Sequence, residues 1–535
     1  MRPRFVQIDR QTPMLLPPDV QDWVASDHLA RFIVEAVEEL DLRMARVNER
    51  GTGDAQYPPG MMFSLLIFSY ATGTFSSRQI ERASKEHLPT RFICANTYPD
   101  HDTICTFRRQ NNELFQQTFR QVLELAEKMK IIKFGQITIA HDGTKIQADA
   151  SKHSAVSYER AGELVAQLEL EIQQLVTKAE AADSTPLQEG LSIPEEIARR
   201  EVRQGQLQKA RQEIEKRARE RAQAQQPEYE QKVAQRQAQR EHGQKVRGPE
   251  PKAPSQVPES KDQYNFTDPE SRIMKAGNGA HFQQAYNAQA SVEVTSRLIV
   301  GQSVTEQAND KQQLAGAVAT VQENVGSVKA ALVDSGYYSA AAVQRVETDD
   351  QNQPTGTRVY AAVDKLSHHR TVEDLEKKAE PVAPGPEAGV KEIMQHRLKT
   401  KEGKALYDLR KETVEPIFGI IKETMGFRRF SLRGKAKAAL EWTVVTLSYN
   451  LRRMHRVQQQ RENPVLVNPT NCGAGKMASR RVWMGVLRVR RFWAHLENSL
   501  RETTVGCFMA ITRRLLPISP RAAITTIRLL SPTGC

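Results

Sequence analysis

Two apolar segments of this 535-residue chain each end in an aspartate. The segment ITIAHDG presents Asp142 and the segment ALVDSG presents Asp334, in each case directly before residues that interrupt a strand. Short apolar runs bounded in this way are typical of buried strands, so we expect each aspartate at a strand end. If the two strands are neighbours, the carboxylates meet at one sheet edge and repel each other unless a cation neutralises them. A hard divalent ion such as Mg²⁺ suits oxygen ligands of this kind.

A third carboxylate is expected in the segment LYDLRKETVEPIFGIIKETMGFRRF, residues 406–430. Pro416 is best tolerated in the first turn of a helix, which would place Glu415 at the helix N-terminus, where the helix dipole favours an ionised carboxylate. Lys422 follows seven residues after Glu415 and is therefore expected on the same helix face. The helix would dock on the sheet through an apolar stripe formed by Ile417, Phe418, Ile421 and Met425.

Positive charge is concentrated around this helix. Residues 397–437 hold 12 basic and 5 acidic residues, and clustered charge of this kind indicates a nucleic-acid contact. A carboxylate and a lysine beside several arginines suit a metal ion next to a phosphodiester. The arginines that we expect to contact DNA are Arg428, Arg429 and Arg433.

Each of these residues also has an ordinary alternative role. An aspartate before Gly or Ser is usually a turn former, Glu415 could merely compensate a helix dipole, and Lys422 could be a solvated surface lysine. Asp149 competes with Asp142 for a metal role but lies farther along the chain. Two strand-end aspartates together with a helix-start glutamate nevertheless favour a functional site. Four histidines show no ligand spacing and are expected to be ordinary: His141, His281, His368 and His369.

The elements that must position the acids follow a mixed α/β order. After the first strand, AYNAQASVEV and RLIVGQSVT predict a hairpin that turns near Thr295. A helix from Asn309, the strand KAALVD, a short Ala-rich helix and the strand RVYAAV (358–363) complete the order. Three strands, a helix, a strand, a helix and a strand predict a mixed α/β layer arrangement.

Two further segments flank or interrupt this layer. Residues 1–130 are predicted to be helical throughout, and successive short helices with tight turns are compatible with either a DNA-binding helix-turn-helix arrangement or a plain bundle. Residues 155–260 are predicted to be an insertion, in which two long helices over about 155–245 fold back as a hairpin and a Pro-rich linker follows. The hairpin's charges are more typical of a solvated face than of a DNA clamp.

The net charge of +12 is unevenly distributed. Residues 456–535 contain 13 Lys and Arg, three Glu and no Asp, so this tail supplies most of the excess. The tail lacks a sustained amphipathic pattern, and we expect it to be poorly ordered, either through translation past the natural domain end or as a basic binding tail.

The cellular setting is predicted from three observations. The longest apolar run, MMFSLLIF, is too short to span a bilayer, and the N-terminus has no apolar signal core. The five cysteines show neither CxxC pairing nor zinc spacing. We therefore expect a cytoplasmic protein with reduced thiols and no membrane partner.

The motifs together resemble DDE-type transposases of bacterial insertion sequences, in the group called insertion sequence eleven-eighty-two. Four segments within about residues 15–455 carry the resemblance: HDGTKIQADASKH, DPESRIMK leading into AYNAQASV, VDSGYYS, and VEPIFGIIKETMGFRRFSLRG. The family implies a helical N-terminal domain and a ribonuclease H-like catalytic domain, here residues 131–455. It also implies a Tyr, Arg, Glu and Lys signature, matched in order by Tyr407, Arg410, Glu415 and Lys422. Four residues separate Arg410 from Glu415 where related families commonly have three, so Lys411 is an alternative for the basic position.

The resemblance implies a DNA transposase that cleaves transposon ends and joins them to target DNA. Asp142, Asp334 and Glu415 would be the catalytic and metal-binding acids for two Mg²⁺ or Mn²⁺ ions. Tyr407, Arg410 and Lys422 would position phosphates, and the protein would act on double-stranded DNA as a homodimer. Two alternatives stay open: a ribonuclease H-like nuclease without strand transfer, and a non-catalytic DNA-binding derivative.

Overall fold

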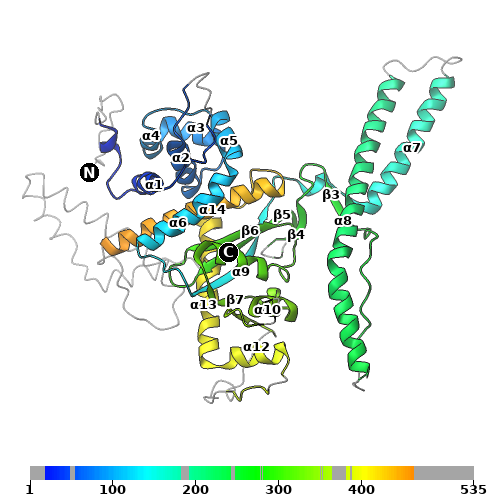
Figure 1. Cartoon of the computed structure of the whole chain (residues 1–535). Helices are drawn as coiled ribbons and strands as arrows, with labels where there is room; N and C mark the ends of the chain where they lie inside the picture. Colours follow the sequence, from blue (N-terminus) through cyan, green and yellow to red (C-terminus); the bar gives the residue numbers. More distant parts are fainter. Residues whose placement is uncertain are drawn as a thin grey trace, which may run out of the picture. The chain divides into compact units, whose positions relative to one another are not determined.

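The computed structural model describes residues 19–47, 55–181, 192–241, 248–276, 279, 281–349, 351, 353–363, 381–385 and 388–462. The chain divides into two units, Met1–Asn463 and Pro464–Cys535, and every element below belongs to the first (Figure 1). Almost all of the tail expected over 456–535, as well as His368 and His369, lies outside the described residues.

Helices precede the sheet in the described N-terminal region. Their bounds are α1 (Leu29–Glu38), α2 (Pro59–Ala71), α3 (Ser77–Glu86), α4 (Leu88–Ile93), α5 (His101–Gln110) and α6 (Asn112–Lys128). The second of these, α2, is apolar on all sides, and its residues from Met62 to Ala71 are buried because α1, α4 and the late helix α14 (Lys435–Glu462) pack around it. None of the helices in the described residues has the length and apolar character needed to cross a membrane.

A mixed sheet follows these helices in the order β4-β5-β1-β7-β8, with β6 also paired to β5. The strands are β1 (Ile137–Gln147), β4 (Arg272–Lys275), β5 (Phe282–Glu293), β6 (Ile299–Thr305), β7 (Val328–Val333) and β8 (Arg358–Ala361). Strand β1 is antiparallel to β5 and parallel to β7, and β7 is parallel to β8. The predicted mixed α/β arrangement is confirmed at this level, and so is the β5–β6 hairpin, whose turn uses Arg297 at a φ of 61°.

Helices cover both faces of the sheet. Helix α9 (Leu314–Val325) packs on β5, β6 and β7, and α10 (Ala340–Glu347) packs beside α9. Helix α12 (Val390–Lys399) contacts β8 and α13 (Lys401–Gly419), which crosses β1, β5 and β7. Because alternate side chains of a strand point to opposite faces, the face of β1 that carries His141 and Gly143 looks toward α9, and the face that carries Asp142 and Thr144 looks toward α13.

A long helical pair occupies the segment between β1 and β5. Helices α7 (Tyr158–Ala181) and α8 (Ile193–Glu241) lie side by side and pack against each other (Figure 1). The short antiparallel strands β2 (Ala155–Ser157) and β3 (Gln263–Asn265), which the sequence patterns did not predict, join its two ends. A small separate core holds the pair together and consists of Val156, Ala161, Val165, Leu207 and Ala210.

Candidate active site

The register of the sheet brings Asp142 and Asp334 side by side. In the parallel pair of β1 and β7, His141 is opposite Val333, so the next residue of each strand is one of the two aspartates. Asp334 directly follows the last residue of β7 and caps a short 3₁₀ turn by accepting a hydrogen bond from the N–H of Ser335 at 2.7 Å. The two acids therefore meet where β7 ends.

Asp142 does not stand at a strand end, contrary to the sequence-based expectation. Strand β1 continues to Gln147, five residues beyond Asp142, because β5 stays paired with it over that whole length. The neighbour on the other side, β7, stops at Val333. Asp142 thus lies at the mid-point of a strand that loses one of its two neighbours at that position, which opens the space beside its carboxylate.

Glu415 does not lie at a helix start, so this expectation is also wrong. Helix α13 begins at Lys401, where the Thr400 hydroxyl accepts a hydrogen bond from the N–H of Gly403 at 3.0 Å. Pro416 lies inside α13, near its C-terminal end, and a π turn (Ile420–Thr424) follows directly. Proline removes one backbone hydrogen bond from the helix, yet α13 continues past it to Gly419. The helix dipole therefore does not favour a carboxylate at Glu415.

The side chain that brings the three acids together is Arg410, one turn earlier in α13. Its guanidinium Nη1 lies 3.5 Å from Oδ2 of Asp142, and its Nη2 lies 3.4 Å from Oε1 of Glu415 and 3.9 Å from Oδ1 of Asp334. The Arg410 side chain is only 7% exposed, whereas those of Asp334 and Glu415 are about half exposed. One buried cation thus stands between three carboxylates that come from three separate elements.

The charge balance at this point is incomplete. Burial raises the pKa of the Asp142 carboxyl to about 6; the Gly143 N–H and Arg410 oppose this shift, and the negative charges of Asp334 and Asp310 add to it. A single guanidinium cannot neutralise three carboxylates. The binding of a further cation near the three carboxylates would therefore be electrostatically favourable.

The donor chemistry fits Mg²⁺ or Mn²⁺, because both ions prefer carboxylate oxygens. Among the residues that the structure describes, however, no group of three or more His, Cys, Asp or Glu side chains is arranged tightly enough to hold a metal ion. The reason is visible in the contacts of Arg410, which occupies the centre of the three acids. A cation bound between the acids would therefore compete with this guanidinium for the carboxylates.

Tyr407 and Lys422 both lie close to the acids. The Arg410 guanidinium lies 5.9 Å from the centre of the Tyr407 ring, and burial raises the pKa of the Tyr407 hydroxyl. Lys422 donates to the Thr144 hydroxyl at 2.5 Å and to the Lys145 carbonyl at 3.3 Å. Thr144 shares a face of β1 with Asp142, so the Lys422 amine stands on the same side of the sheet as that acid. Burial lowers the pKa of Lys422.

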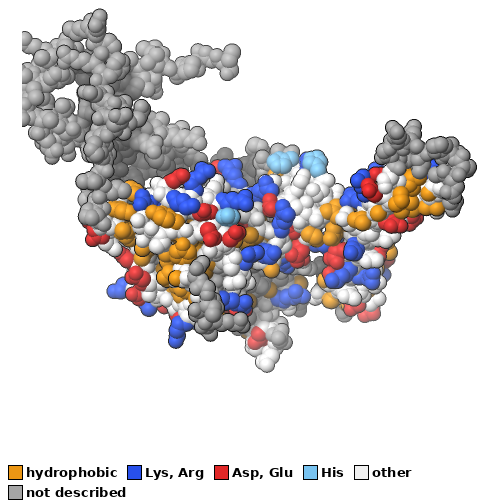
Figure 2. All heavy atoms as spheres, turned by 90° about the horizontal axis from the view of Figure 1, so that it is seen from above, with side chains coloured by type: hydrophobic (Ala, Val, Ile, Leu, Met, Phe, Trp, Pro, Cys, Tyr) orange, Lys and Arg blue, Asp and Glu red, His pale blue; other side chains and the backbone are white. Residues whose placement is uncertain are grey.

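The three predicted DNA-contacting arginines follow the π turn and are paired with acids. Asp149, the competitor for the metal role, accepts from Arg429 and, at 2.9 Å, from Arg433. Arg428 pairs with Glu423. On the face of the molecule shown in Figure 2, Lys and Arg side chains are likewise interspersed with Asp and Glu side chains. Asp149 therefore serves here as a partner of arginines rather than as a member of the Arg410 cluster.

Two protein-family models match the chain. The model described as Transposase domain (DUF772) matches residues 18–110, and the model described as Transposase DDE domain matches residues 376–455. These matches support a transposase of the DDE type. The second match includes Tyr407, Arg410, Glu415 and Lys422, whereas Asp142 and Asp334 lie between the two matches. No curated protein and no solved structure matches the chain.

A DDE domain implies nuclease or polynucleotidyl-transfer activity on DNA, and such transposases typically use divalent metal ions. The mixed sheet with flanking helices is consistent with the ribonuclease H-like fold of this family.

Sequence reasoning missed a polar cluster on the opposite face of β1 from Asp142. Asp310 accepts hydrogen bonds from the Asn287 amide at 2.6 Å and the Gln289 amide at 2.8 Å, and Lys145 lies 3.9 Å from the same carboxylate oxygen. The side-chain oxygen of Gln289, Oε1, also accepts a hydrogen bond from the hydroxyl of Tyr337, which lies three residues after Asp334. The sequence did contain a sign of this cluster. Along β5, the polar residues Asn287, Gln289 and Ser291 occupy alternate positions that are usually apolar in a buried strand.

His141 has the ordinary structural role expected of it. It is buried beneath the site, its Nδ1 lies 2.8 Å from the Ser291 hydroxyl, and its ring packs edge-on against Tyr337. Burial lowers the pKa of His141 to about 4, so the imidazole is neutral near pH 7.

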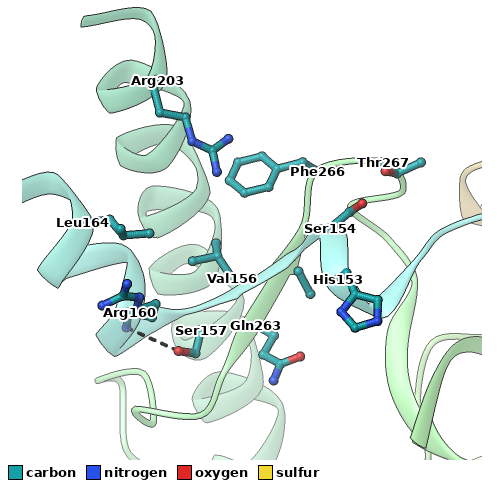
Figure 3. Close-up of a pocket in the computed structure, with 11 residues that line it drawn as sticks. His153, Ser154, Val156, Ser157, Arg160, Leu164, Arg203, Gln263, Phe266 and Thr267 are labelled. Carbon is teal, nitrogen blue, oxygen red and sulfur yellow. Dashed lines mark hydrogen bonds between the residues drawn. The ribbon is translucent and has the colours of Figure 1, made fainter. Parts of the chain in front are cut away.

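A cavity of about 560 Å³ lies at the base of the α7–α8 pair and contains none of the three acids. Figure 3 shows the Arg203 side chain beside the Phe266 ring, with its guanidinium 4.9 Å from the ring centre. Val156 and Leu164 line the same cavity. Its walls belong to the insertion and its joining strands, so the cavity is separate from Asp142, Asp334 and Glu415.

Proposed function

We propose that this chain is a DNA transposase of the insertion sequence eleven-eighty-two group. It cleaves DNA at the transposon ends, and the freed 3′-hydroxyl then attacks target DNA to join the strands. The observation that carries the proposal is the convergence of Asp142, Asp334 and Glu415 on one guanidinium. These acids are separated by up to 273 positions in the chain, and only the sheet register and the path of α13 bring them together. The matches to transposase models, which lie before and after the sheet strands in the sequence, support the same conclusion.

The acids have distinct tasks in the proposed reaction. Asp142, the most buried of the three, would be shared between two Mg²⁺ or Mn²⁺ ions, and Asp334 and Glu415 would each hold one. When bound, such ions activate the attacking oxygen and stabilise the leaving oxygen of the phosphodiester. The half-exposed positions of Asp334 and Glu415 leave the DNA strand access to this centre.

The basic residues orient the DNA. With metal ions held by the acids, Arg410 would be free to pair with a phosphate, for which a guanidinium has matching geometry. The half-buried Lys422 amine and the Tyr407 hydroxyl hold phosphate oxygens beside Asp142 and Asp334. Arg428, Arg429 and Arg433 exchange their acidic partners for the DNA backbone. The helices within residues 1–130 bind the transposon end, and two copies of the chain act together on DNA.

The test replaces Asp334 with asparagine, which keeps the size of the side chain but removes its charge. The substrate is a duplex that carries the inverted repeats flanking the coding sequence. In Mg²⁺ at one fixed salt concentration, cleavage should collapse while the gel shift of the same duplex survives, because affinity comes from the basic residues. Asp408→Asn, which removes an exposed carboxylate from α13, is the matched control and should cleave normally. Unchanged cleavage by the Asp334 variant would remove this residue from the catalytic set.

A strand-joining assay with supercoiled target DNA separates this proposal from a nuclease that cuts without transfer. Joined products that depend on Asp142, Asp334 and Glu415 support the transposase, whereas cleavage without joining supports the nuclease.

A further inference from the structure

Glu441, on α14, is a fully buried carboxylate that takes no part in the proposed chemistry. Its Oε2 accepts hydrogen bonds from the backbone N–H of Ser431 at 2.8 Å and of Leu432 at 3.1 Å. Its Oε1 accepts from the hydroxyl of Tyr70, on α2, at 3.1 Å. One side chain therefore joins the N-terminal helices to the segment that carries the predicted DNA-contacting arginines.

A buried charged group also lies on the N-terminal helices, next to Tyr70. Arg108, on α5, is 4% exposed and donates to the Tyr70 hydroxyl at 2.8 Å. Burial raises the pKa of Glu441, and the positive charge of Arg108 and the two backbone N–H groups favour its ionised form. Two buried ionisable groups thus share one tyrosine hydroxyl, which accepts from Arg108 and donates to Glu441.

We call residues 425–434 the arginine loop, because they contain Arg428, Arg429 and Arg433. Its buried side is held at several points. The Phe430 N–H donates to the Gln147 carbonyl of β1 at 2.8 Å, and Phe427 packs edge-on against Phe75 with ring centres 5.2 Å apart. A side chain at Gly73, whose φ is +88°, would come within 2.9 Å of the Met425 carbonyl oxygen, so the end of α2 lies directly against the loop.

The two sides of the arginine loop differ in character. Phe427 and Phe430 are fully buried, whereas the Arg429 and Arg433 side chains are 53% and 58% exposed and meet Asp149. The loop also runs alongside the end of β1, because Gln147 and Arg429 form a parallel bridge. An anchor on the buried side therefore determines where the exposed arginines stand relative to Asp142, which lies on the same strand.

We propose that Glu441 is a positioning residue that couples the N-terminal helices to the arginine loop. It fixes the backbone at Ser431 and Leu432, and so holds Arg429 and Arg433 in place for the DNA backbone, while Tyr70 and Arg108 fix Glu441 itself. The N-terminal helices and the arginine loop then form a single DNA-contacting surface. This inference rests on the proposed function, in which the loop arginines bind DNA.

The experiment compares four variants of the full chain. Glu441→Gln removes the charge but keeps one oxygen for the loop. Tyr70→Phe removes the hydroxyl that Glu441 and Arg108 share, and leaves the bonds of Glu441 to the loop intact. Arg429→Ala/Arg433→Ala removes the side chains that Glu441 is proposed to position. Asn450→Ala is the matched control: Asn450 lies on the same helix, is equally buried, and bonds to both the N–H and the carbonyl of Ile299, away from the loop.

The first readout is affinity for a mixed-sequence duplex as a function of salt. The arginine double variant should lower the slope of log K against log salt by about 2, since each lost phosphate contact contributes about 0.9. Glu441→Gln should lower it in the same direction, and adding Glu441→Gln to the arginine double variant should give no further loss. Asn450→Ala should leave the slope unchanged. Additive losses would show that Glu441 acts only through general stability and would overturn the inference.

The second readout is hydrogen exchange of the Ser431 and Leu432 amides without DNA. Both should exchange roughly tenfold faster in Glu441→Gln, because a charge-assisted hydrogen bond becomes a neutral one. Tyr70→Phe should show a smaller increase, which keeps the inference testable if Glu441→Gln fails to fold. Unchanged exchange in both variants would refute the positioning role. If the arginine double variant leaves the salt slope unchanged, the proposed DNA role of the loop fails, while the exchange rates still decide the role of Glu441.

Discussion

Replacing Asp142 with asparagine should stabilise the metal-free protein near neutral pH. Burial raises the pKa of this carboxyl from 3.8 to about 6 in the folded state, and Arg410 with the Gly143 N–H only partly oppose the shift. A shift of about two units corresponds to roughly 3 kcal/mol of differential stability between the two protonation states. Asparagine keeps the shape of the side chain and removes the charge that burial disfavours.

The direction of the pH dependence follows from linkage. A carboxyl whose pKa is raised on folding binds its proton more tightly in the folded state, so its favourable contribution is complete below 3.8 and is lost as the pH rises through about 6. The free energy of unfolding of Asp142→Asn should therefore approach that of the wild type in acid. Above about pH 6 it should exceed the wild type by up to about 3 kcal/mol.

Urea unfolding in chelator across this pH range measures the difference. Asp408→Asn is the control, since this exposed carboxylate on α13 should give no such pH-dependent gain. Adding Mg²⁺ or Mn²⁺ should raise the stability of the wild type through binding to the folded state and should do so much less for Asp142→Asn. If Asp142→Asn were no more stable than the wild type above pH 6, the argument from burial and charge would be refuted.

Other variants examine the remaining parts of the site. Arg410→Gln should bind Mn²⁺ several-fold more tightly than the wild type in a calorimetric titration, because the guanidinium no longer competes for the carboxylates; equal or weaker binding would contradict its role as their counter-ion. Lys422→Ala should slow cleavage of an end-bearing duplex while leaving Mn²⁺ affinity unchanged in the same titration. Trp442→Ala should cost about 3–5 kcal/mol in urea unfolding, because the fully buried indole also donates to the Gln289 carbonyl at 3.0 Å; a loss below 1 kcal/mol would show that the core can close around the gap.

The sequence indicated that the first two acids each follow an apolar strand, whereas the structure supplies the parallel pairing of β1 and β7 that brings them together. Asp142 and Asp334 come directly after apolar runs that had to be buried strands, and neighbouring parallel strands bring their next residues side by side. The strand length was less predictable. Nothing in HDGTKIQ marks it as strand, because its burial depends on β5, which pairs with it from more than a hundred residues away.

Glu415 shows why the third element was misread. Proline is usually a signal of a helix start, but here the Thr400 cap and the packing of α13 across the sheet outweigh that local preference. The central position of Arg410 could not be derived from spacing, since it depends on the crossing angle of α13 over β1. Asp310 was missed for a similar reason: it lies in a connection after β6, and only its contacts with Asn287 and Gln289 give it a place near the site.

The small β2–β3 ladder has a consequence for how this fold can vary between relatives. Because Ala155 is paired with Asn265, the chain leaves the six-stranded sheet and returns to it at nearly the same point, whatever segment lies between these two residues. The sheet therefore fixes the register of Asp142 and Asp334 but places no requirement on the number of residues that separate them in the gene. Relatives could lengthen, shorten or exchange the α7–α8 pair as a cassette without moving the acids. Recognition of such relatives should accordingly depend on the segments around each acid and not on a constant interval between them.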